Sequence, residues 1–445
     1  MKKGILLGAI FLFLVCSGCA GGEEGTEGSS SAASRVPARR EVITVVTDLN
    51  REGTEWLARL ISGFNAGQEG IRVELTVHDS QDTFREYLSS FGAAGLLPDL
   101  IGGREYAMLC RDGLYRPITG ELKEDRAFAS LEPELQTLPL RGEECYGAVF
   151  RMDSVGYFAN AELVKDATGS APTYPMTVES FLSAIEAVTE KTEAFGLDSE
   201  EHLIQWYAAS RYRQYGFTGF DGTRFYLTGK VFREGLEIAG ELYADRASYT
   251  SAHTAATPAQ QEEAFRRGEV AFLYGRLSDL SRHGELPFRV RFCGIPGGRP
   301  FFEPSFLGIS VNCGKVAAAY RFLQYLCFSE EGAEARLGAE PPGGVVSLPL
   351  RGEERFCDRF FSRLNLPGLK SLFARREEAA FSGLSLLPGY RYLTETARIF
   401  APDDTILTVP EAFRALIRKE QDPELLETLH NDLNGIYALY LSPEE

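Results

Sequence analysis

The chain has 445 residues, of which 44% are hydrophobic and 11% aromatic, and its formal net charge is −17. This length allows two domains of ordinary size, each with its own hydrophobic core. Because phosphate binding needs clustered lysine and arginine, so acidic a chain is a poor candidate for nucleic-acid binding, and the charge instead suits solubility outside the cell.

The first 18 residues have the features of a secretory leader. A basic N-terminus precedes the apolar run Ile5 to Val15, which is shorter than the roughly 20 residues that a membrane span needs. Small residues then lead to Cys19 in a pattern that resembles the lipobox of bacterial lipoproteins, although Cys16 stands where that motif usually has leucine. We expect residues 1–18 to be a signal peptide and Cys19 to carry diacylglycerol that anchors the chain to the bacterial cell membrane. A single transmembrane anchor is the alternative.

Residues 19–40 are expected to be a flexible tether. Gly, Ser, Glu and Ala dominate this stretch, and Val36 is its one large apolar residue. Such a segment cannot bury enough apolar surface to offset its ordering entropy.

Six cysteines follow Cys19: Cys110, Cys145, Cys293, Cys313, Cys327 and Cys357. They form no C-x-x-C pair, and the histidines are few and scattered, so neither a zinc site nor another metal or cofactor is expected. Disulfides are permitted outside the cytoplasm. A Cys293–Cys313 pair and buried free thiols both remain open.

The first elements alternate between strand and helix. Strand patterns at Glu41–Thr47, Ile71–Val77 and Leu96–Ile101 enclose helical patterns at Glu55–Phe64 and Thr83–Phe91. This order predicts an open α/β sheet with right-handed crossovers. In such sheets ligands bind beyond the carboxyl ends of the strands.

The rest of the chain mixes short strands with helices, and its last hundred residues are mainly helical. Extended runs are expected at 145–150, 154–158, 270–274, 288–295 and 307–311. Helices are expected to begin at 161 and to occupy 175–188, 202–215, 231–243, 258–267, 317–328 and 425–440.

Several short motifs occur in an order typical of one known family. They are Gly95-Leu-Leu-Pro-Asp-Leu-Ile101, Leu109-Cys-Arg-Asp-Gly-Leu-Tyr-Arg-Pro-Ile118, Tyr146-Gly-Ala-Val149 with Val155-Gly-Tyr-Phe-Ala-Asn160, Ala264-Phe-Arg-Arg-Gly-Glu-Val-Ala-Phe272, and Ser305-Phe-Leu-Gly-Ile-Ser-Val311 with the helix after it. In this order the chain from Glu41 to Tyr440 resembles the extracellular solute-binding proteins of ABC importers. That group, family 1, includes maltose-binding and other carbohydrate-binding lipoproteins.

The resemblance implies an α/β, two-lobed periplasmic-binding-protein fold of type II, with a hinge and a helical C-terminal segment. Lobe 1 would comprise residues 41–150 plus 302–348, and lobe 2 residues 151–301 plus 349–445. A monomer would hold its solute in the cleft between the lobes, which would close by hinge motion.

The residues expected to line the cleft follow strands, stand at crossovers, or lie on the aromatic and C-terminal helices: Asp48, Asn50, Arg104, Glu105, Tyr106, Arg151, Asp153, Trp206, Tyr207, Tyr274, Arg276, Phe306 and Tyr390. Asp48 or Asn50 could instead cap a helix, Arg151 and Asp153 could merely pair with each other, and Trp206 could pack in a core. Leu277 stands roughly where sugar-binding relatives often carry a tryptophan, which weakens the case for a stacking platform at that turn. If Arg104, Arg151 and Arg276 converge, an anionic solute becomes attractive.

The expected function is to bind an extracellular solute, with a carbohydrate favoured, and to deliver it to an ABC permease. Two alternatives remain: the ligand-binding component of a sensor or receptor system, and a binder of an anionic non-sugar solute. An enzyme is not expected, because the sequence has no G-x-S-x-G elbow, H-E-x-x-H motif or Walker loop.

Overall fold

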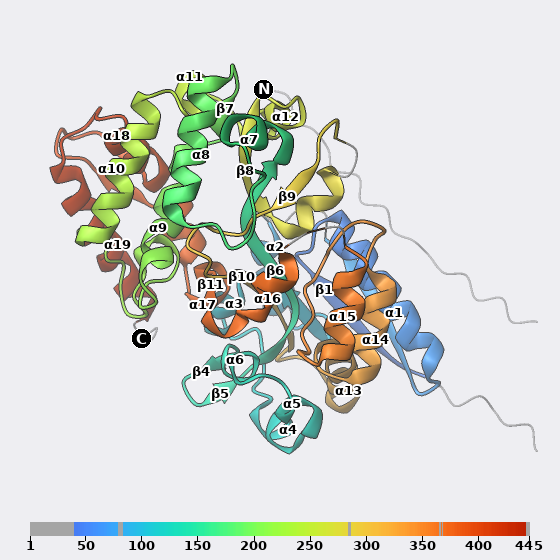
Figure 1. Ribbon diagram of the computed structural model, residues 1–445. Helices are drawn as coiled ribbons and strands as arrows, with labels where there is room; N and C mark the ends of the chain where they lie inside the picture. Colours follow the sequence, from blue (N-terminus) through green and yellow to red (C-terminus); the bar gives the residue numbers. More distant parts are fainter. Residues whose placement is uncertain (1–39, 79–82, 284–285, 365, 367, 442–445) are drawn as a thin grey trace, which may run out of the picture. The chain divides into compact units, whose positions relative to one another are not determined.

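The computed structural model describes residues 40–78, 83–283, 286–364, 366 and 368–441 (Figure 1). The expected leader, the lipid-bearing Cys19 and nearly all of the tether lie outside the described residues. No helix in the described part is long and apolar enough to cross a membrane.

The chain opens with the predicted parallel sheet. Strand β1 (Glu41–Thr47) pairs with β2 (Ile71–Val77) on one side and β3 (Leu100–Gly103) on the other. Helices α1 (Arg51–Gly67) and α2 (Phe84–Ala93) make the crossovers. Ile43, Val45 and Val46 of β1 are fully buried, and α1 turns an apolar face toward the sheet, which explains why the sequence pattern was clear.

Two long antiparallel strands lie in the middle of the sheet, between β3 and the strands of the second half. Strand β6 (Gly147–Asn160) and strand β10 (Phe301–Ile309) are buried along their whole length. The strand order is β2-β1-β3-β10-β6-β8-β7. The register between β6 and β10 shifts at Ser305/Phe306. The two extended runs expected at 145–150 and 154–158 are therefore largely one strand that crosses from one half of the sheet to the other.

The second half of the sheet contains β7 (Phe195–Leu197), β8 (Val270–Arg276) and β9 (Val290–Phe292). Strand β9 is shorter than the expected run 288–295. It ends because Gly294 adopts a left-handed φ of 64° and lies against Gly156, where a Cβ would come within 2.5 Å of the Gly294 Cα.

Helices cover this half of the sheet: α7 (Ala161–Thr168), α8 (Val178–Lys191), α9 (Leu203–Arg211), α10 (Lys230–Ala244), α11 (Tyr249–Ala252), α12 (Pro258–Arg266), α18 (Val409–Ile417) and α19 (Glu424–Leu441). Three short 3₁₀ helices belong here as well: Glu200–His202, Phe217–Gly219 and Leu277–His283. The helix expected at 202–215 is thus a 3₁₀ turn followed by the shorter α9.

The remaining elements are mostly short: α3 (Tyr106–Arg111), α4 (Thr119–Glu124), α5 (Arg126–Ala129), α6 (Pro133–Thr137), β4 (Leu140–Arg141), β5 (Glu144–Cys145), α13 (Val316–Cys327), α14 (Glu330–Ala339), α15 (Glu354–Ser362), α16 (Leu369–Ala374), the 3₁₀ turn Arg376–Glu378, β11 (Ala380–Phe381), α17 (Gly383–Leu386), the π-helix Tyr392–Thr396, β12 (Arg398–Phe400) and β13 (Ile406–Thr408).

Two hydrophobic cores flank the crossing strands. One contains Trp56, Ile101 and Phe322, and the other contains Phe181 and Trp206. Figure 1 shows α1, α13, α14 and α15 gathered together, apart from α8, α10, α18 and α19. Helix α15 packs on α14, so part of the segment after residue 348 lies with the first core rather than with the second.

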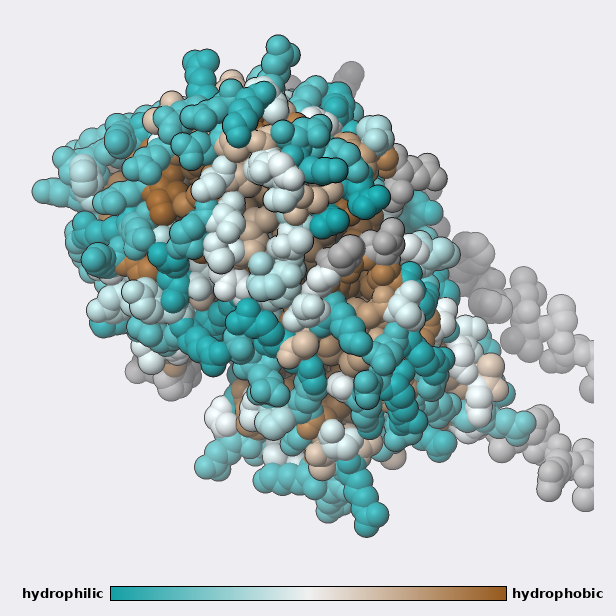
Figure 2. All heavy atoms as spheres, viewed as in Figure 1, coloured by the Kyte–Doolittle hydropathy of each residue, from teal (hydrophilic) through white to brown (hydrophobic). Residues whose placement is uncertain are grey.

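The six cysteines of the described residues are all free thiols, and five of them are buried. Cys293 lies in the second core and Cys313 in the first, so they form no disulfide. The face seen in Figure 2 is predominantly hydrophilic, as the strongly negative net charge leads one to expect.

Candidate functional site

A cavity of about 750 Å³ lies where residues after β1 and β3 meet residues from the second half of the sheet. Asp48, Leu49, Asn50 and Arg104 line it from the first half. The opposite wall is built by β8, the Asp198–Gln205 segment, the Leu277–His283 turn and the C-terminal segment around Tyr390. The cavity therefore occupies the place that the sheet topology predicts for a ligand.

The carboxyl ends of β1 and β3 are joined by Asp48 and Arg104. The Arg104 backbone N–H donates to Asp48 Oδ2 at 3.1 Å, and the Arg104 Nε lies 3.5 Å from the same oxygen. Asn50 has both roles that its sequence position allows: its Oδ1 accepts the Gly53 N–H at 2.9 Å to cap α1, and the residue also lines the cavity.

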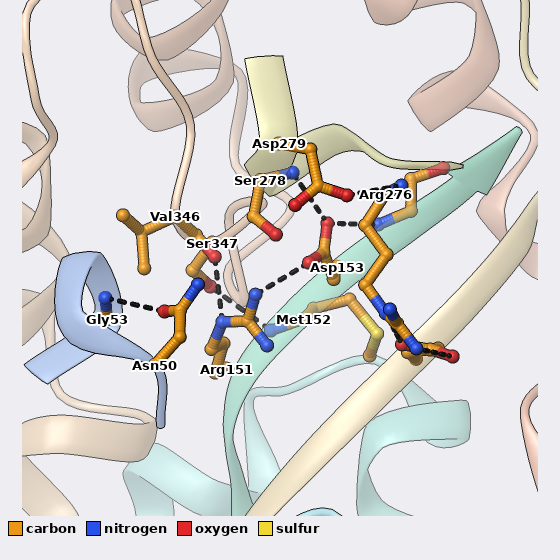
Figure 3. A network of polar contacts seen from close by, with 12 residues as sticks. Asn50, Gly53, Arg151, Met152, Asp153, Arg276, Ser278, Asp279, Val346 and Ser347 are labelled. Atoms are coloured by element: carbon orange, nitrogen blue, oxygen red, sulfur yellow. Dashed lines mark hydrogen bonds and ion pairs between the residues drawn. The ribbon is translucent and has the colours of Figure 1, made fainter. Parts of the chain in front are cut away.

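The crossing strand β6 carries a buried polar network (Figure 3). Arg151 Nη2 contacts Asp153 Oδ2 at 2.6 Å, and Arg151 Nε donates to the Val346 carbonyl at 2.9 Å. Asp153 Oδ1 accepts the Ser278 N–H at 3.1 Å. Burial raises the pKa of Asp153 although Arg151 opposes the change. Arg151 lines the cavity, whereas Asp153 stands behind it as the partner of Arg151.

A third chain segment runs beside the middle of β6. The Leu348 N–H donates to the Met152 carbonyl at 2.7 Å, and the Met152 N–H donates to Ser347 Oγ at 3.1 Å. Residues 346–348 therefore bind to β6 where this strand passes between the two cores.

Arg276 at the end of β8 pairs with Glu303 on β10. Its Nε lies 2.5 Å from Glu303 Oε2 and its Nη2 3.2 Å from Oε1. Burial by itself would raise the pKa of Glu303, but Arg276, with Arg104 and Arg151 further away, holds it below its usual value. Both residues line the cavity.

The arginines of the cavity wall are neutralised by carboxylates. Besides the pairs of Arg104, Arg151 and Arg276, Arg282 lies 3.5 Å from Asp279. The described carboxylates of the lining outnumber these four arginines: they are Asp48, Asp198, Glu201, Glu262, Asp279, Glu303 and Glu395. The three arginines singled out from the sequence do line one cavity, but they do not make it positively charged.

One wall of the cavity is formed by His202, Tyr274 and Asp198. The rings of His202 and Tyr274 stack with centroids 4.3 Å apart and planes 18° apart. Asp198 Oδ2 accepts the Tyr274 N–H at 3.1 Å and lies 3.3 Å from His202 Nε2. The Tyr274 hydroxyl donates to Gln205 Oε1 at 3.2 Å.

Burial lowers the pKa of His202, but the attraction and hydrogen bonding of Asp198, aided by Glu201 and Glu200, outweigh it and leave the pKa above its usual value. Tyr274 was a sequence candidate, whereas Asp198 and His202 were missed. Their spacing of four residues was the available signal, but strand β7, which places Asp198, is too short to be recognised.

Tyr390 also lines the cavity, and its hydroxyl lies 3.0 Å from Thr218 Oγ1. Glu105 does not line it. It is half-buried beside the cavity, with Arg391 Nη1 3.5 Å from its Oε1. Because Arg391 directly follows Tyr390, this ion pair ties the C-terminal segment to the residue before α3.

Four sequence candidates lie in the cores instead of the cavity wall. Tyr106 and Phe306 are fully buried and stack on each other at 4.3 Å, and the Tyr106 hydroxyl donates to the Pro139 carbonyl at 2.7 Å. Trp206 and Tyr207 are buried because α9 is covered by packing on most of its circumference. The sequence position of an aromatic residue after a strand or on a helix does not reveal whether its side chain faces the core or the cavity. Here all four side chains face a core.

The other described lining residues, which the sequence did not indicate, come mostly from the second half of the sheet and the C-terminal segment: Val155, Phe158, Glu201, Ile204, Gln205, Phe217, Thr218, Pro258, Gln261, Glu262, Leu273, Ser278, Asp279, Arg282, His283, Glu303, Ser382, Leu384, Thr394, Glu395, Val409, Pro410 and Phe413. They come from many separate segments, and tertiary packing alone assembles them.

Two halves of one sheet, joined by crossing strands with a polar cavity between them, define a two-lobed solute-binding protein. The chain belongs to the bacterial extracellular solute-binding protein family, whose sequence profile matches residues 59–341. This confirms the family predicted from the motifs, the location outside the cytoplasm, and a binding rather than a catalytic role. No curated protein sequence matches the chain.

Solved structures of low sequence identity share the fold. The ABC substrate-binding protein Lmo0181 from Listeria monocytogenes, in complex with cycloalternan, has a TM-score of 0.71 at 16% identity, covering 90% of this chain and 99% of that one. The sugar-binding protein MalE from Xanthomonas citri has a TM-score of 0.69 at 16% identity, covering 89% and 98%. The cyclic alpha-maltosyl-1,6-maltose binding protein from Arthrobacter globiformis has a TM-score of 0.68 at 15% identity, covering 89% and 99%. The predicted periplasmic-binding-protein fold is confirmed.

Proposed function

We propose that the chain binds an extracellular carbohydrate in the 750 Å³ cavity and delivers it to an ABC permease. The observation that carries the proposal is the neutralised polar wall, in which each cavity arginine is paired with a carboxylate. Such a wall offers many hydrogen-bonding groups without a free charge. An uncharged solute rich in hydroxyl groups matches it better than an anion, which would have to displace a carboxylate from its arginine.

The size and make-up of the cavity support a small-molecule ligand. Its volume lies within the roughly 300–1,000 Å³ that is usual for such sites. Apolar residues such as Phe217, Leu273 and Phe413 alternate with the polar ones, and a sugar presents both an apolar ring face and polar hydroxyls. The sugars named for two structural neighbours, cycloalternan and cyclic alpha-maltosyl-1,6-maltose, support the same class of solute.

Contact with both halves of the sheet would couple binding to lobe closure. Asp48, Asn50 and Arg104 approach the solute from one side, and Tyr274, Arg276 and Tyr390 approach it from the other. A ligand shifts a conformational equilibrium only through its differential affinity for the two states, and a solute that touches both walls has that property when the lobes are closed.

The proposal includes a membrane tether. Lipid on Cys19 would hold one copy of the chain beside its permease, and residues 19–40 would give it reach, which raises its effective concentration there. Mass spectrometry of the membrane-extracted protein tests this step. A lipid-bearing N-terminal peptide that disappears in Cys19→Ala is expected, and an unmodified membrane-bound wild type would contradict it.

The solute class is tested by thermal shift of the purified chain from residue 40 onward. Cycloalternan, maltotetraose and tagatose form one set, and gluconate and glucose 6-phosphate form the other. A ligand that binds only the folded state raises the Tm by mass action. We expect a rise with at least one neutral sugar. A rise confined to the anionic set would overturn the carbohydrate assignment.

A further inference from the structure

His202 is placed so that its two ring nitrogens have different surroundings. Nε2 lies 3.3 Å from Asp198 Oδ2, whereas Nδ1 is buried and has no hydrogen-bond partner among the described residues. The side chain is 22% exposed, lines the cavity and stacks on Tyr274. A solute in the cavity therefore meets the His202–Tyr274 pair as part of the wall.

The proton on His202 decides the charge of this wall. In the neutral ring, the contact with Asp198 favours the tautomer with hydrogen on Nε2, which leaves Nδ1 as an acceptor. In the protonated ring both nitrogens donate, and imidazolium and Asp198 form a neutral ion pair. Without that proton Asp198, which is 1% exposed, carries a charge that no described cation balances.

The other charged groups around His202 are already engaged. Glu201 is paired with Arg414 at 2.7 Å. Glu200 is fully buried, and its Oε2 accepts hydrogen bonds from the hydroxyls of Ser248 and Thr250. From β8 the neighbours are the uncharged Tyr274 ring and its backbone N–H. Asp198 is thus the carboxylate that responds most directly to the charge on His202.

A solute that fills the cavity removes water from this contact. Opposite charges attract more strongly as the local dielectric falls, and a buried lone carboxylate becomes more costly. The charged pair is therefore favoured over Asp198 beside a neutral imidazole once the water has left.

We propose that solute binding is coupled to proton uptake by His202, so that the chain captures its solute more tightly as the pH falls through neutrality. The proposal rests on the proposed function only in requiring that a solute occupies the cavity. His202 is then a solute-contacting residue. Asp198 stabilises its positive charge, and Tyr274 stacks on its ring.

Calorimetric titration with maltotetraose or cycloalternan, at pH 7 in phosphate and in Tris, measures the protons taken up through the difference in buffer ionisation heat. We expect a fractional uptake for the wild type and none for His202→Gln. Between pH 6 and 8 the wild-type association constant should fall with rising pH by up to about tenfold per pH unit, the limit for one linked proton.

The matched control is His253→Gln. His253 also lies against a tyrosine ring, that of Tyr249, with centroids 4.3 Å apart, but it does not line the cavity. This variant should keep the wild-type uptake. A wild type that binds sugar without uptake, or a His202→Gln variant with the wild-type uptake, overturns the inference while leaving the proposed function intact.

Proton NMR provides a readout that needs no solute. The His202 imidazole resonance, identified by its loss in His202→Gln, should titrate at a higher pH in the wild type than in Asp198→Asn. Equal midpoints overturn the inference. Failure of every sugar to bind at any pH between 6 and 8 would instead count against the proposed function.

Discussion

Arg151 and Asp153 form a buried ion pair with an N–O distance of 2.6 Å on the strand that crosses between the two halves of the sheet. Their side chains are 7% and 1% exposed. The pair also binds the Val346 carbonyl and the Ser278 N–H, so it joins three chain segments at the point where the lobes meet. Ligand contact was expected for both residues, with pairing to each other as the alternative. The geometry gives Asp153 a positioning role, in which it acts through Arg151.

Asp153→Asn should destabilise the fold strongly. It leaves the Arg151 guanidinium buried without its counter-charge, and breaking such a pair costs about 3–5 kcal/mol. Urea denaturation at pH 7 measures the free energy of unfolding. The control is Asp358→Asn, which removes the exposed partner of Lys370 and should change little. Equal stability of the two variants would contradict the role given to Asp153.

Arg276→Met should lower the free energy of unfolding at neutral pH, and this loss should be smaller at acidic pH. Arg276 holds the pKa of Glu303 below its ordinary value of 4.5. The stabilisation from this pair is therefore complete above about pH 4.5 and is lost as the pH falls through the lower folded-state pKa. Because burial without Arg276 raises the pKa of Glu303 in the variant, the difference in unfolding free energy between wild type and variant should be largest near neutral pH and should shrink steadily as the pH falls.

Denaturation series at pH 7, 5, 4 and 3 measure this difference. Arg267→Met removes the solvent-exposed partner of Glu269 and serves as the control, with a smaller effect expected at every pH because solvent screens that pair. A wild-type advantage over Arg276→Met that grows toward pH 3 would refute the assignment.

Glu340→Gln should stabilise the chain at alkaline pH. Burial raises the pKa of Glu340 to about 7, although the Val346 N–H and Arg336 act in the opposite direction. Between about pH 4.5 and 7 the folded chain binds more protons here than the unfolded chain, so this group's contribution to stability falls as the pH rises. At pH 8 the variant avoids the buried charge and should gain on the order of 2 kcal/mol.

The gain from Glu340→Gln should shrink toward pH 5, where the wild-type carboxyl is already protonated. Denaturation midpoints at pH 5 and pH 8 measure this change. Glu334→Gln on helix α14, which ends just before Glu340, removes an exposed partner of Arg359 and should show no such pH dependence. A variant less stable than the wild type at pH 8 would show that the charge is needed at this position.

The sequence predicted the parts of the fold that local periodicity encodes. Strands β1 and β2 were predicted with their observed bounds. The continuity of β6 could not be predicted, because burial on both faces removes the alternation that marks a strand. Helix α15 packs on α14 and contributes Cys357, Phe360 and Phe361 to the first core, a choice of partner that its amphipathic pattern alone does not reveal.

The site was predicted mainly at the ends of strands, and Arg151 on β6 and Tyr390 are the predicted lining residues that lie elsewhere. Asp48, Asn50, Arg104, Tyr274 and Arg276 line the cavity because the ends of neighbouring strands share one edge of the sheet. Aromatic type alone failed for Trp206 and Phe306, because cores and sugar sites use the same side chains. Whether an arginine is available to a ligand depends on its carboxylate partner, and Glu303 lies 27 residues from Arg276.

Tyr390 and Tyr106 should separate binding from stability. Tyr390 lines the cavity, so Tyr390→Ala should reduce the sugar-induced rise in Tm by removing a contact on the wall opposite Asp48.

Tyr106 is fully buried, donates to the Pro139 carbonyl and accepts the Tyr146 N–H. Tyr106→Phe leaves both of those groups unsatisfied and should cost about 1–3 kcal/mol of unfolding free energy. The Tm rise with saturating sugar should nevertheless survive in Tyr106→Phe. Thermal shift with and without maltotetraose measures both effects, and a Tyr106→Phe variant of wild-type stability that no longer responds to sugar would return Tyr106 to the binding site.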